Sequence, residues 1–567
     1  MSEIVLQGIG GSAGFVAAPC FYYKPLDLTP PIHPPASMAE ELARFLAARE
    51  KAQAELEALY TRLKTSVDEN SAQIFIGHKA LLLDPVFHAA VLEQIEKGAI
   101  IEVAVQHAAK DIALIFQNSG NPLLAARVAD MRDVAQRLMR VLLNLQDTSL
   151  LALNTASIVI ADDLTPSDTV NLNPQLAKGI CLAGGGETSH AAILARTMGI
   201  PAVVGLGRAA IDTLNNVHLI ALDGSSGQVI INPNPETLAR YEVAQAHQNA
   251  HSERKKTLSQ QPARTANGRA VHVMANIGDL ASAQQAVKYG AEGIGLLRTE
   301  FLYLDRSVPP DENEQIQTYH AIFEQLGDRP IVVRTLDIGG DKPPHFMEFP
   351  QEANPFLGWR GIRVCLDHPN LFKTQLRAIL RAAVGKNVSI MYPMIDELPT
   401  LDAANRLLAE VRTELNAAKI AYARNISVGV MIETPAAALT VDLLQSGCDF
   451  FSIGTNDLTQ YTLACDRNNA LVTRYFDPFS PSVLRLVKHT IDAAHAAGKR
   501  VGMCGELAGD PIAIPLLLGL GLDEFSMAAV SIPEAKWIIS QFSDSVARVV
   551  ALHILTLPTA EDIRFYL

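Results

Sequence analysis

Cysteine is scarce and scattered in this sequence, which holds six cysteines in 567 residues and no CxxC pair. This spacing argues against a disulfide framework and against a structural zinc site. The amino terminus, residues 1–4, lacks the cationic region and apolar core of a signal peptide. The longest uncharged apolar run, Pro511–Leu522, is too short to span a bilayer and contains prolines. We therefore expect a soluble, reduced, cytoplasmic protein that does not insert into a membrane.

Basic residues are in the minority, with 47 Lys and Arg against 60 Asp and Glu, so the formal net charge is −13. This balance argues against a nucleic-acid partner and is compatible with a basic protein partner. Hydrophobic residues make up 49% and charged residues 19% of the chain, which are values of folded proteins. Because single cores stop growing near about 250–300 residues, the length predicts more than one domain.

The first half of the chain combines strand patterns with a long helical insertion. Residues 1–22 give a short strand, a Gly-rich turn and a second strand, and strand patterns return at 156–161 and continue to 229–231. Between these two strand regions, hydrophobic residues recur with the period of an α-helix. We predict an α/β domain from residues 1–22 and 148–233, an inserted helical bundle at 24–146 and a linker helix at 234–262.

The helical insertion carries an apolar stripe and three breaks. The stripe predicts one buried helix face and consists of Leu42, Phe45, Leu46, Leu56 and Leu59. The breaks predict several antiparallel helices and lie at Asp84-Pro85, Lys97-Gly98 and Gly120-Asn121-Pro122.

From residue 263 to 567, short apolar runs alternate with amphipathic helical segments, which predicts a (β/α)₈ barrel. The sequence offers nine candidate runs, whereas the barrel has eight strands, so one of the runs is not a strand. They are Val271–Asn276, Gly293–Leu297, Ile331–Arg334, Gly361–Val364, Val388–Met391, Val428–Ile432, Phe450–Ile453, Val501–Cys504 and Glu524–Met527.

Five of these runs lead directly into polar residues, at the end of the barrel where active sites form. The residues are Arg298, Arg334, Glu433, Asn456 with Asp457, and Cys504. Any one of them alone suits a structural ion pair, but five strands that converge on one mouth indicate a site, because unpaired buried charge is costly.

The residue types suggest what this mouth binds. Arg298, Arg334 and Arg467 are suited to phosphate and carboxylate groups, and Arg360 is a further candidate. Glu433 and Asp457 are hard oxygen ligands suited to Mg²⁺, and Asn456 can orient a ligand oxygen. Cys504 is placed to act as an acid, although a buried cysteine is more often an inert part of a core.

A second candidate centre lies at Gly184–Arg196, where three glycines precede Glu187-Thr188-Ser189-His190. Thr188 or Ser189 can cap a helix over Ala191–Met198, which places His190 at its amino-terminal end. This end favours a bound anion and disfavours protonation of the imidazole, so a nucleophilic nitrogen is retained. On spacing alone, an ordinary surface histidine beside a Gly-rich turn fits equally well.

Two motifs resemble known signatures. The His190 segment, Gly-Gly-x-Thr-x-His-Ala-Ala and onward, resembles the phosphohistidine signature of the phosphoenolpyruvate-utilising enzymes, and Asp449–Arg467 resembles their second signature. The segments at 296–301, 334–342 and 502–509 are similar to those of the Enzyme I family of the bacterial sugar phosphotransferase system. Dikinases resemble this chain only from the phosphohistidine domain onward, and they need an ATP-binding region, whereas here helices without a Gly-rich phosphate loop precede it.

The resemblance implies a two-step relay. Phosphoenolpyruvate and Mg²⁺ bind at the barrel mouth, held by Arg298, Arg334, Arg360, Asn456, Asp457 and Arg467 with Glu433 on the metal. His190 takes the phosphoryl group, Cys504 protonates enolpyruvate, and the phosphohistidine domain swivels to pass the group to a histidine of the carrier protein HPr. In the family HPr docks on the helical insertion, and homodimers form through the barrel.

Two departures from the family pattern concern the carrier. Ile76 stands before Gly77-His78 where an acidic residue is usual, with Asn70 and Ser71 where charges are common, and Glu187 replaces a usual Arg. Alternatives therefore remain: a paralogue that serves a special HPr-like carrier, such as a fructose-linked one, a dikinase-like fragment, or a silent regulator that binds phosphoenolpyruvate. The presence of His190, Glu433, Asp457 and Cys504 argues against silence.

Overall fold

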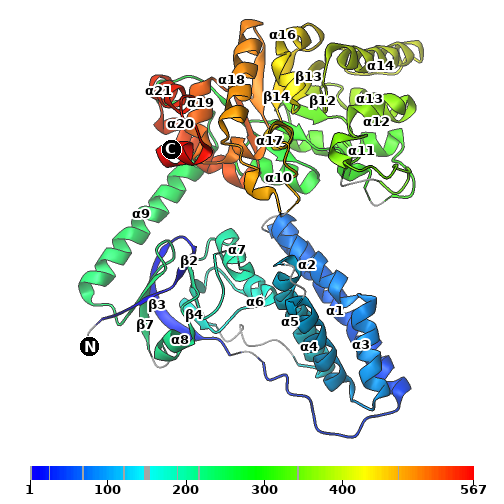
Figure 1. Ribbon diagram of the computed structural model, residues 1–567. Helices are drawn as coiled ribbons and strands as arrows, with labels where there is room; N and C mark the ends of the chain where they lie inside the picture. The colour runs from blue at the N-terminus through cyan, green and yellow to red at the C-terminus, as the bar shows by residue number, and fades with distance from the viewer. Residues whose placement is uncertain are drawn as a thin grey trace. The chain divides into compact units, whose positions relative to one another are not determined.

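The computed structural model (Figure 1) divides into two units, residues 1–251 and residues 252–567, which are described separately below. It describes residues 3–24, 26–66, 69–118, 122–145, 153–187, 189–214, 217–304, 306–340, 344–469 and 471–567, without the side chains of 62–66, 69–73, 118 and 122–126.

The first unit is built on one eight-stranded sheet in the order β1-β8-β7-β3-β4-β5-β6-β2. The strands are β1 Ile4–Gln7, β2 Ile9–Ser12, β3 Phe15–Tyr22, β4 Ser157–Ala161, β5 Ala177–Leu182, β6 Ala202–Val204, β7 Leu219–Asp223 and β8 Gln228–Ile231. The central run β3-β4-β5-β6 is parallel, and β4 is buried along its whole length, as expected for a strand covered on both faces. The sequence predicted two strands before residue 23, where the structure has three.

Five helices interrupt this sheet between β3 and β4. They are α1 Met38–Ser66, α2 Glu69–Leu82, α3 Pro85–Glu96, α4 Ile101–Asn118 and α5 Pro122–Leu142. The predicted stripe faces their shared core, where Phe45 and Leu56 are fully buried. The predicted break at Asp84-Pro85 is confirmed, since Asp84 caps α3 and its side chain accepts from the N–H of Val86. The boundary between α1 and α2 was not predicted, and residues 67 and 68 between them lie outside the described residues, as do Gly120 and Asn121 of the third predicted break.

Three shorter helices complete the first unit: α6 Pro166–Asn171, α7 His190–Thr197 and α8 Arg208–Leu214. The side of α7 that carries Ala191, Ala192 and Ala195 packs into a core formed with β4 and β5. The linker helix α9, Pro235–Ser259, follows β8 in the chain.

The second unit is a closed barrel of eight parallel strands, which confirms the predicted fold class. The strands are β9 His272–Ile277, β10 Ile294–Leu297, β11 Ile331–Arg334, β12 Val388–Tyr392, β13 Ser427–Ile432, β14 Phe450–Ile453, β15 Arg500–Met503 and β16 Glu524–Met527. The larger helices of this unit are α10 Leu280–Lys288, α11 Glu312–Leu326, α12 Ile362–Asp367, α13 Pro369–Ala382, α14 Leu398–Ala417, α15 Pro435–Leu439, α16 Val441–Leu444, α17 Thr455–Leu463, α18 Pro481–Ala496, α19 Ala513–Leu520, α20 Ile532–Gln541, α21 Asp544–Ile554 and α22 Ala560–Tyr566.

The surplus strand among the nine candidates is Gly361–Val364, which was a wrong prediction. Gly361 takes a left-handed backbone with φ 59° and precedes α12, and Ile362, Val364 and Cys365 are buried on this helix. A short apolar run does not distinguish a buried strand from a buried helix, because either element hides it from water.

The apolar run Pro511–Leu522 becomes α19, whose Leu516, Leu517 and Leu518 lie in the barrel core. Among the described residues, no single helix has the length and apolar composition to cross a membrane. Only the pair Ile74–Leu82 and Pro85–Glu96, bent by 42°, passes both tests jointly. Phe75, Phe87 and Val91 of that pair are buried in the helical core.

Candidate active site

The predicted polar residues of the barrel meet at one mouth. Arg334 ends β11, Glu433 follows β13, and Cys504 follows β15. Together with the residues after β10 and β14 they line a cavity of about 500 Å³. All eight predicted barrel residues line it, namely Arg298, Arg334, Arg360, Glu433, Asn456, Asp457, Arg467 and Cys504.

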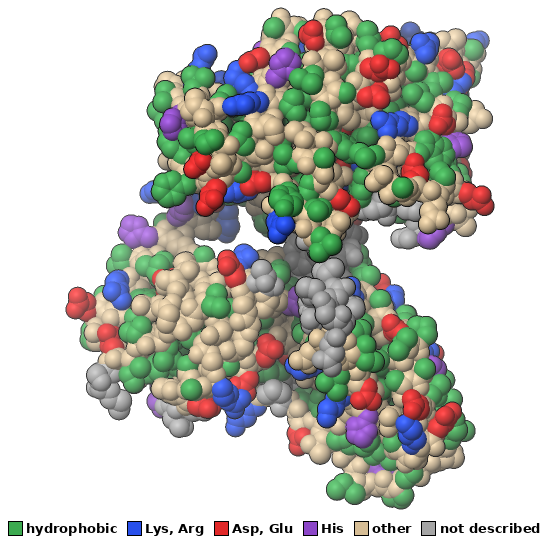
Figure 2. Space-filling model, viewed as in Figure 1, with side chains coloured by type: hydrophobic (Ala, Val, Ile, Leu, Met, Phe, Trp, Pro, Cys, Tyr) green, Lys and Arg blue, Asp and Glu red, His purple; other side chains and the backbone are tan. Residues whose placement is uncertain are grey.

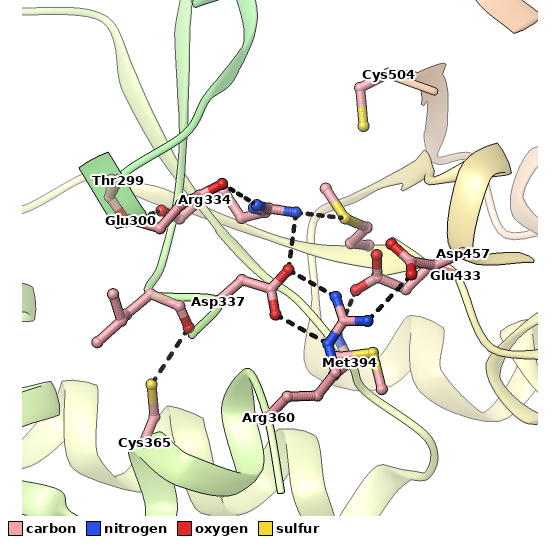
Figure 3. Close-up of polar contacts among 12 residues, drawn as sticks. Thr299, Glu300, Arg334, Asp337, Arg360, Cys365, Met394, Glu433, Asp457 and Cys504 are labelled. Atoms are coloured by element: carbon pink, nitrogen blue, oxygen red, sulfur yellow. Dashed lines mark hydrogen bonds and ion pairs between the residues drawn. The ribbon is translucent and has the colours of Figure 1, made fainter. Parts of the chain in front are cut away.

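A network of ion pairs joins residues that line this cavity (Figure 3), and Asp337 is at its centre. Asp337 Oδ2 lies 3.2 Å from Arg334 and 3.0 Å from Arg360. Arg334 also pairs with Glu300 at 2.8 Å, and Arg360 with Asp457 at 3.1 Å. The five side chains are at most about a tenth exposed, so each guanidinium is fixed by carboxylates on two sides.

The network keeps its charges despite burial. Burial opposes ionisation of Asp337, but the guanidinium groups of Arg360 and Arg334 hold its pKa below the ordinary value. Burial likewise opposes the charge of Arg334, and the carboxylates of Glu300 and Asp337 nevertheless raise its pKa. The site therefore presents rigid cations to an anionic ligand.

Glu433 lies beside this network and is 1% exposed. Its Oε1 accepts a hydrogen bond of 2.6 Å from the backbone N–H of Met394, a residue in the left-handed region with φ 55°. Burial, and next the charge of Asp457, raise the pKa of Glu433 to about 8. At neutral pH this carboxyl group therefore favours its protonated form.

Asn456 and Arg298 sit on the more open side of the mouth. Asn456 Oδ1 accepts from the backbone N–H of Glu506 at 3.0 Å, so the amide is oriented. The side chain of Arg298 is exposed, and in the described part of the chain no carboxylate pairs with it at 4.0 Å or less. Arg467 is 30% exposed and lies 3.7 Å from Asp457.

The thiol of Cys504 belongs to an apolar cluster inside the barrel. Burial raises its pKa to about 11, and its sulfur lies 3.8 Å from the carbonyl oxygen of Ile453. At neutral pH the group is a thiol, which retains a proton that it can donate.

The first unit positions His190 at the start of α7, as predicted. Ser189 is the N-cap, and its hydroxyl accepts from the backbone N–H of Ala192 at 3.4 Å. Thr188 lies outside the described residues. The ring of His190 is 37% exposed, and its Nδ1 lies 3.5 Å from Asp130 Oδ1 on α5. Since Nδ1 faces a carboxylate, the outer nitrogen, Nε2, is the one that carries a free lone pair when the ring is neutral.

Three family models of the phosphoenolpyruvate-utilising enzymes match the chain: the amino-terminal region at 7–127, the mobile domain at 153–227 and the phosphoenolpyruvate-binding domain at 252–543. Phosphoenolpyruvate-protein phosphotransferases from Bacillus sp. (strain S) and Geobacillus stearothermophilus are each 44% identical over 562 residues, which is 99% of this chain and 97% of the relative. This chain belongs to the phosphoenolpyruvate-protein phosphotransferase family. A solution structure of Enzyme I (nEIt) is 31% identical and covers 43% of this chain and 99% of that chain, with a TM-score of 0.36.

Membership of the phosphotransferase family confirms the resemblance found in the sequence. It also argues against a dikinase-like fragment, because the two relatives that match 99% of this chain are phosphotransferases. The roles of the individual site residues in this phosphotransferase stay predictions.

Sequence reasoning missed the residues that hold the site together. Asp337 and Glu300 were not singled out as site residues, although each lies three residues or fewer from a predicted arginine. That spacing was an available signal. Asp130 and His78 of the helical insertion gave no such signal, because only the fold brings them to His190.

Proposed function

We propose that this chain transfers the phosphoryl group of phosphoenolpyruvate to its own His190, releases pyruvate, and passes the group to a histidine of HPr or an HPr-like carrier. One observation carries the proposal: arginines, paired carboxylates and a buried thiol converge on one barrel mouth, in a chain whose other unit presents a partly exposed His190 with Nδ1 beside Asp130. The barrel site suits the substrate's phosphate and carboxylate, and His190 suits the phosphoryl group.

The arginines are proposed to bind the anionic ends of the substrate. Arg298 and Arg467 are accessible for direct contact, whereas Arg334 and Arg360 present guanidinium groups already fixed by Asp337. Because these cations are already in place, little reorganisation free energy is needed when charge develops on the phosphoryl group during transfer. Asn456 orients a substrate oxygen from the opposite side.

Glu433 and Asp457 are proposed to hold Mg²⁺. Within the described ranges no cluster of three or more metal-ligating side chains exists, and this donor set fits Mg²⁺, which takes one or two carboxylates and completes its shell with substrate phosphate and water. Glu433 is buried and its pKa is raised, so a bound cation would stabilise its ionised form, which supports this assignment. When bound, the ion supplies neutralisation of charge on the phosphoryl oxygens.

The chemical step follows from these positions. His190 Nε2 forms a bond to phosphorus while the bond from phosphorus to the enol oxygen breaks in line, and the electron pair stays on enolpyruvate. Cys504 then donates its proton to the methylene carbon, which gives pyruvate, and the thiol regains a proton from water. Because the two centres belong to different units, the domain that carries His190 must swivel to the barrel and back.

The helical insertion is proposed to dock the carrier, and the chain is proposed to act in the cytoplasm as a homodimer through the barrel. Ile76 on α2 is 39% exposed where the family has an acidic residue, so this part of the carrier surface is expected to be less basic or more apolar. The side chains of Asn70 and Ser71 lie outside the described residues. Exposed Val549 and Phe565 near the carboxyl terminus are groups that a dimer would cover. On the face in Figure 2, acidic and basic side chains are interspersed, which does not suit nucleic acid.

Incubation with Mg²⁺ and phosphoenolpyruvate labelled on phosphorus, with His190→Ala alongside, tests the relay. We expect acid-labile label on the wild type only, which a panel of HPr-like carriers removes. Transfer to a fructose-linked carrier alone would identify the paralogue. Binding of phosphoenolpyruvate without any label would favour the silent regulator and contradict the proposal.

A further inference from the structure

A buried histidine lies behind His190 in the first unit. His78, on α2, has no exposed surface and stands between two carboxylates of α5. Its Nε2 lies 3.2 Å from Asp130 Oδ1, and its Nδ1 lies 3.4 Å from Asp133 Oδ2. The ring of Phe75 meets it edge-on at 5.6 Å.

Of the two ring nitrogens of His78, Nε2 has a hydrogen-bond partner among the described residues and Nδ1 has none. The ring therefore contacts Asp130 through a hydrogen bond, whereas Asp133 lies near Nδ1 without one.

Other charged groups around His78 belong to a connected chain. Asp133 Oδ2 accepts from the hydroxyl of Ser167 at 2.9 Å, and Ser167 accepts from Arg137 at 2.7 Å. Arg137 in turn pairs with Glu55 at 2.9 Å. The remaining charged groups near His78 are Arg127, whose guanidinium lies 3.6 Å from the Cβ position of Gly77, Asp168 beside Ser167, and His190 itself. Asp133 is thereby fixed, and so is the orientation of His78.

Asp130 connects this buried group to the nucleophile. The same oxygen, Oδ1, lies 3.2 Å from His78 Nε2 and 3.5 Å from His190 Nδ1. Helices α2, α5 and α7 each contribute one member to the chain His78–Asp130–His190. The helical insertion therefore reaches the phosphorylated histidine through hydrogen-bonding groups as well as through packing.

We propose that His78 is a positioning residue for phosphoryl transfer: its hydrogen bond to Asp130 keeps that carboxylate beside Nδ1 of His190. This rests on the proposed function of His190. A carboxylate beside Nδ1 favours the neutral tautomer of His190 that carries its proton on Nδ1, which leaves the lone pair on Nε2 for attack on phosphorus. Without His78, Asp130 loses this partner and is free to turn away from His190.

The kinetic test compares His78→Gln with His88→Gln as a matched control. His88 lies in the same bundle on α3, stacked against Phe45, so the control makes the same chemical change elsewhere. We measure the single-turnover rate of His190 phosphorylation by phosphoenolpyruvate and Mg²⁺ from pH 5.5 to 9. His78→Gln is expected to slow the reaction about 10- to 100-fold at saturating phosphoenolpyruvate, with the substrate concentration for half-maximal rate unchanged. His88→Gln should keep the wild-type profile.

A second variant and a direct observation protect the test from a folding defect. Asp130→Ala removes the carboxylate that contacts both rings and is expected to slow the reaction at least as much. In the wild-type protein, ¹⁵N NMR of the neutral His190 ring is expected to show the proton on Nδ1, and in His78→Gln a mixture of the two tautomers. A wild-type rate in His78→Gln, or an unchanged tautomer distribution, would overturn the inference. Absence of His190 phosphorylation in the wild type would instead contradict the proposed function.

Discussion

At the scale of single residues, the barrel site is organised by one carboxylate that lines the cavity. Asp337 fixes both Arg334 and Arg360, and Asp457 completes the hold on Arg360. A phosphate ligand therefore meets cations whose positions are already determined, which lowers the entropy cost of binding and of reaching the transition state.

Replacement of Asp337 tests this role. Asp337→Asn leaves Arg334 and Arg360 each with one carboxylate and is expected to raise the KM for phosphoenolpyruvate about tenfold or more. Because the change breaks a buried pair, it should also lower the free energy of unfolding by about 3 kcal/mol in urea titrations. Asp396→Asn, which removes an exposed partner of Arg363 at 3.7 Å, is the control and should change both quantities little. An unchanged KM in Asp337→Asn would contradict the positioning role.

The proposed role of Cys504 leads to a separate prediction about the proton that enolpyruvate receives. Since its thiol stays protonated at neutral pH, it can exchange protons with the methyl group of pyruvate once the enol forms. Cys504→Ala should still yield phosphorylated His190 from phosphoenolpyruvate, because free enolpyruvate is protonated by water. Enzyme-catalysed exchange of pyruvate methyl hydrogens in D₂O, followed by NMR, should fall about 100-fold or more. Exchange at the wild-type rate would assign the proton to another group.

Glu524 predicts a pH dependence of stability. It begins β16, and its carboxyl lies against Gly295 and Gly502 inside the barrel. Burial raises its pKa above the ordinary value of 4.5, and Arg500 opposes the shift in part. The folded state thus binds this proton more tightly than the unfolded state, so the contribution is full below pH 4.5 and is lost as pH rises through the raised pKa.

Urea unfolding of wild type and Glu524→Gln at several pH values checks the sign. Relative to the glutamine variant, which cannot ionise, the wild type should lose stability as the pH rises above 4.5. A stability difference that does not change with pH, or one that grows in favour of the wild type, would show that the carboxyl group is not destabilised by burial.

At the scale of elements, the barrel strands were predictable because a buried parallel strand is a short apolar run and its carboxyl end carries polar site residues. The His190 helix was predictable from its cap. The prediction of a strand at Gly361–Val364 was wrong because a buried helix and a buried strand can give the same short apolar run. The boundary between α1 and α2 was missed because the helical period of the sequence continues across it. Asp337 was within reach of pattern reasoning, whereas His78 and Asp130 needed the contact of three helices that are remote in sequence.

The end of the linker helix α9 is fixed by one buried amine. Lys536, 2% exposed, donates to the carbonyl oxygens of Ser259, Gln261 and Gly290 at 2.9, 2.7 and 2.8 Å. It also pairs with Glu292 at 3.2 Å. Lys536→Met would leave these acceptors without their donor and should lower the free energy of unfolding of the barrel by about 3 kcal/mol.

Thermal and urea unfolding of Lys536→Met, beside the exposed-site variant Lys488→Met, measures this anchor. Lys488 pairs with Asp492 one helical turn away on the same face of α18, so its replacement should cost about 0.5 kcal/mol or less. Equal stability of the two variants would show that the end of α9 is held by other contacts.

At the scale of the whole molecule, the proposed reaction is divided between two units of the chain. The barrel binds and polarises phosphoenolpyruvate, and the sheet domain with its helical insertion carries and orients His190. Neither unit holds a complete reaction centre by itself. The proposed swivel is therefore part of the chemistry, and family membership over nearly the full chain supports reading both units together.

The most direct test of the central claim is to identify the phosphorylated atom. The full chain is mixed with Mg²⁺ and phosphoenolpyruvate and followed by ³¹P NMR, beside His190→Ala and Glu433→Gln. In the wild type we expect one phosphoramidate signal, on Nε2 of His190, that appears together with pyruvate and is removed by the carrier. The signal should be absent from His190→Ala and strongly reduced in Glu433→Gln. A phosphoryl group on another residue, or pyruvate formed without phosphohistidine, would contradict it.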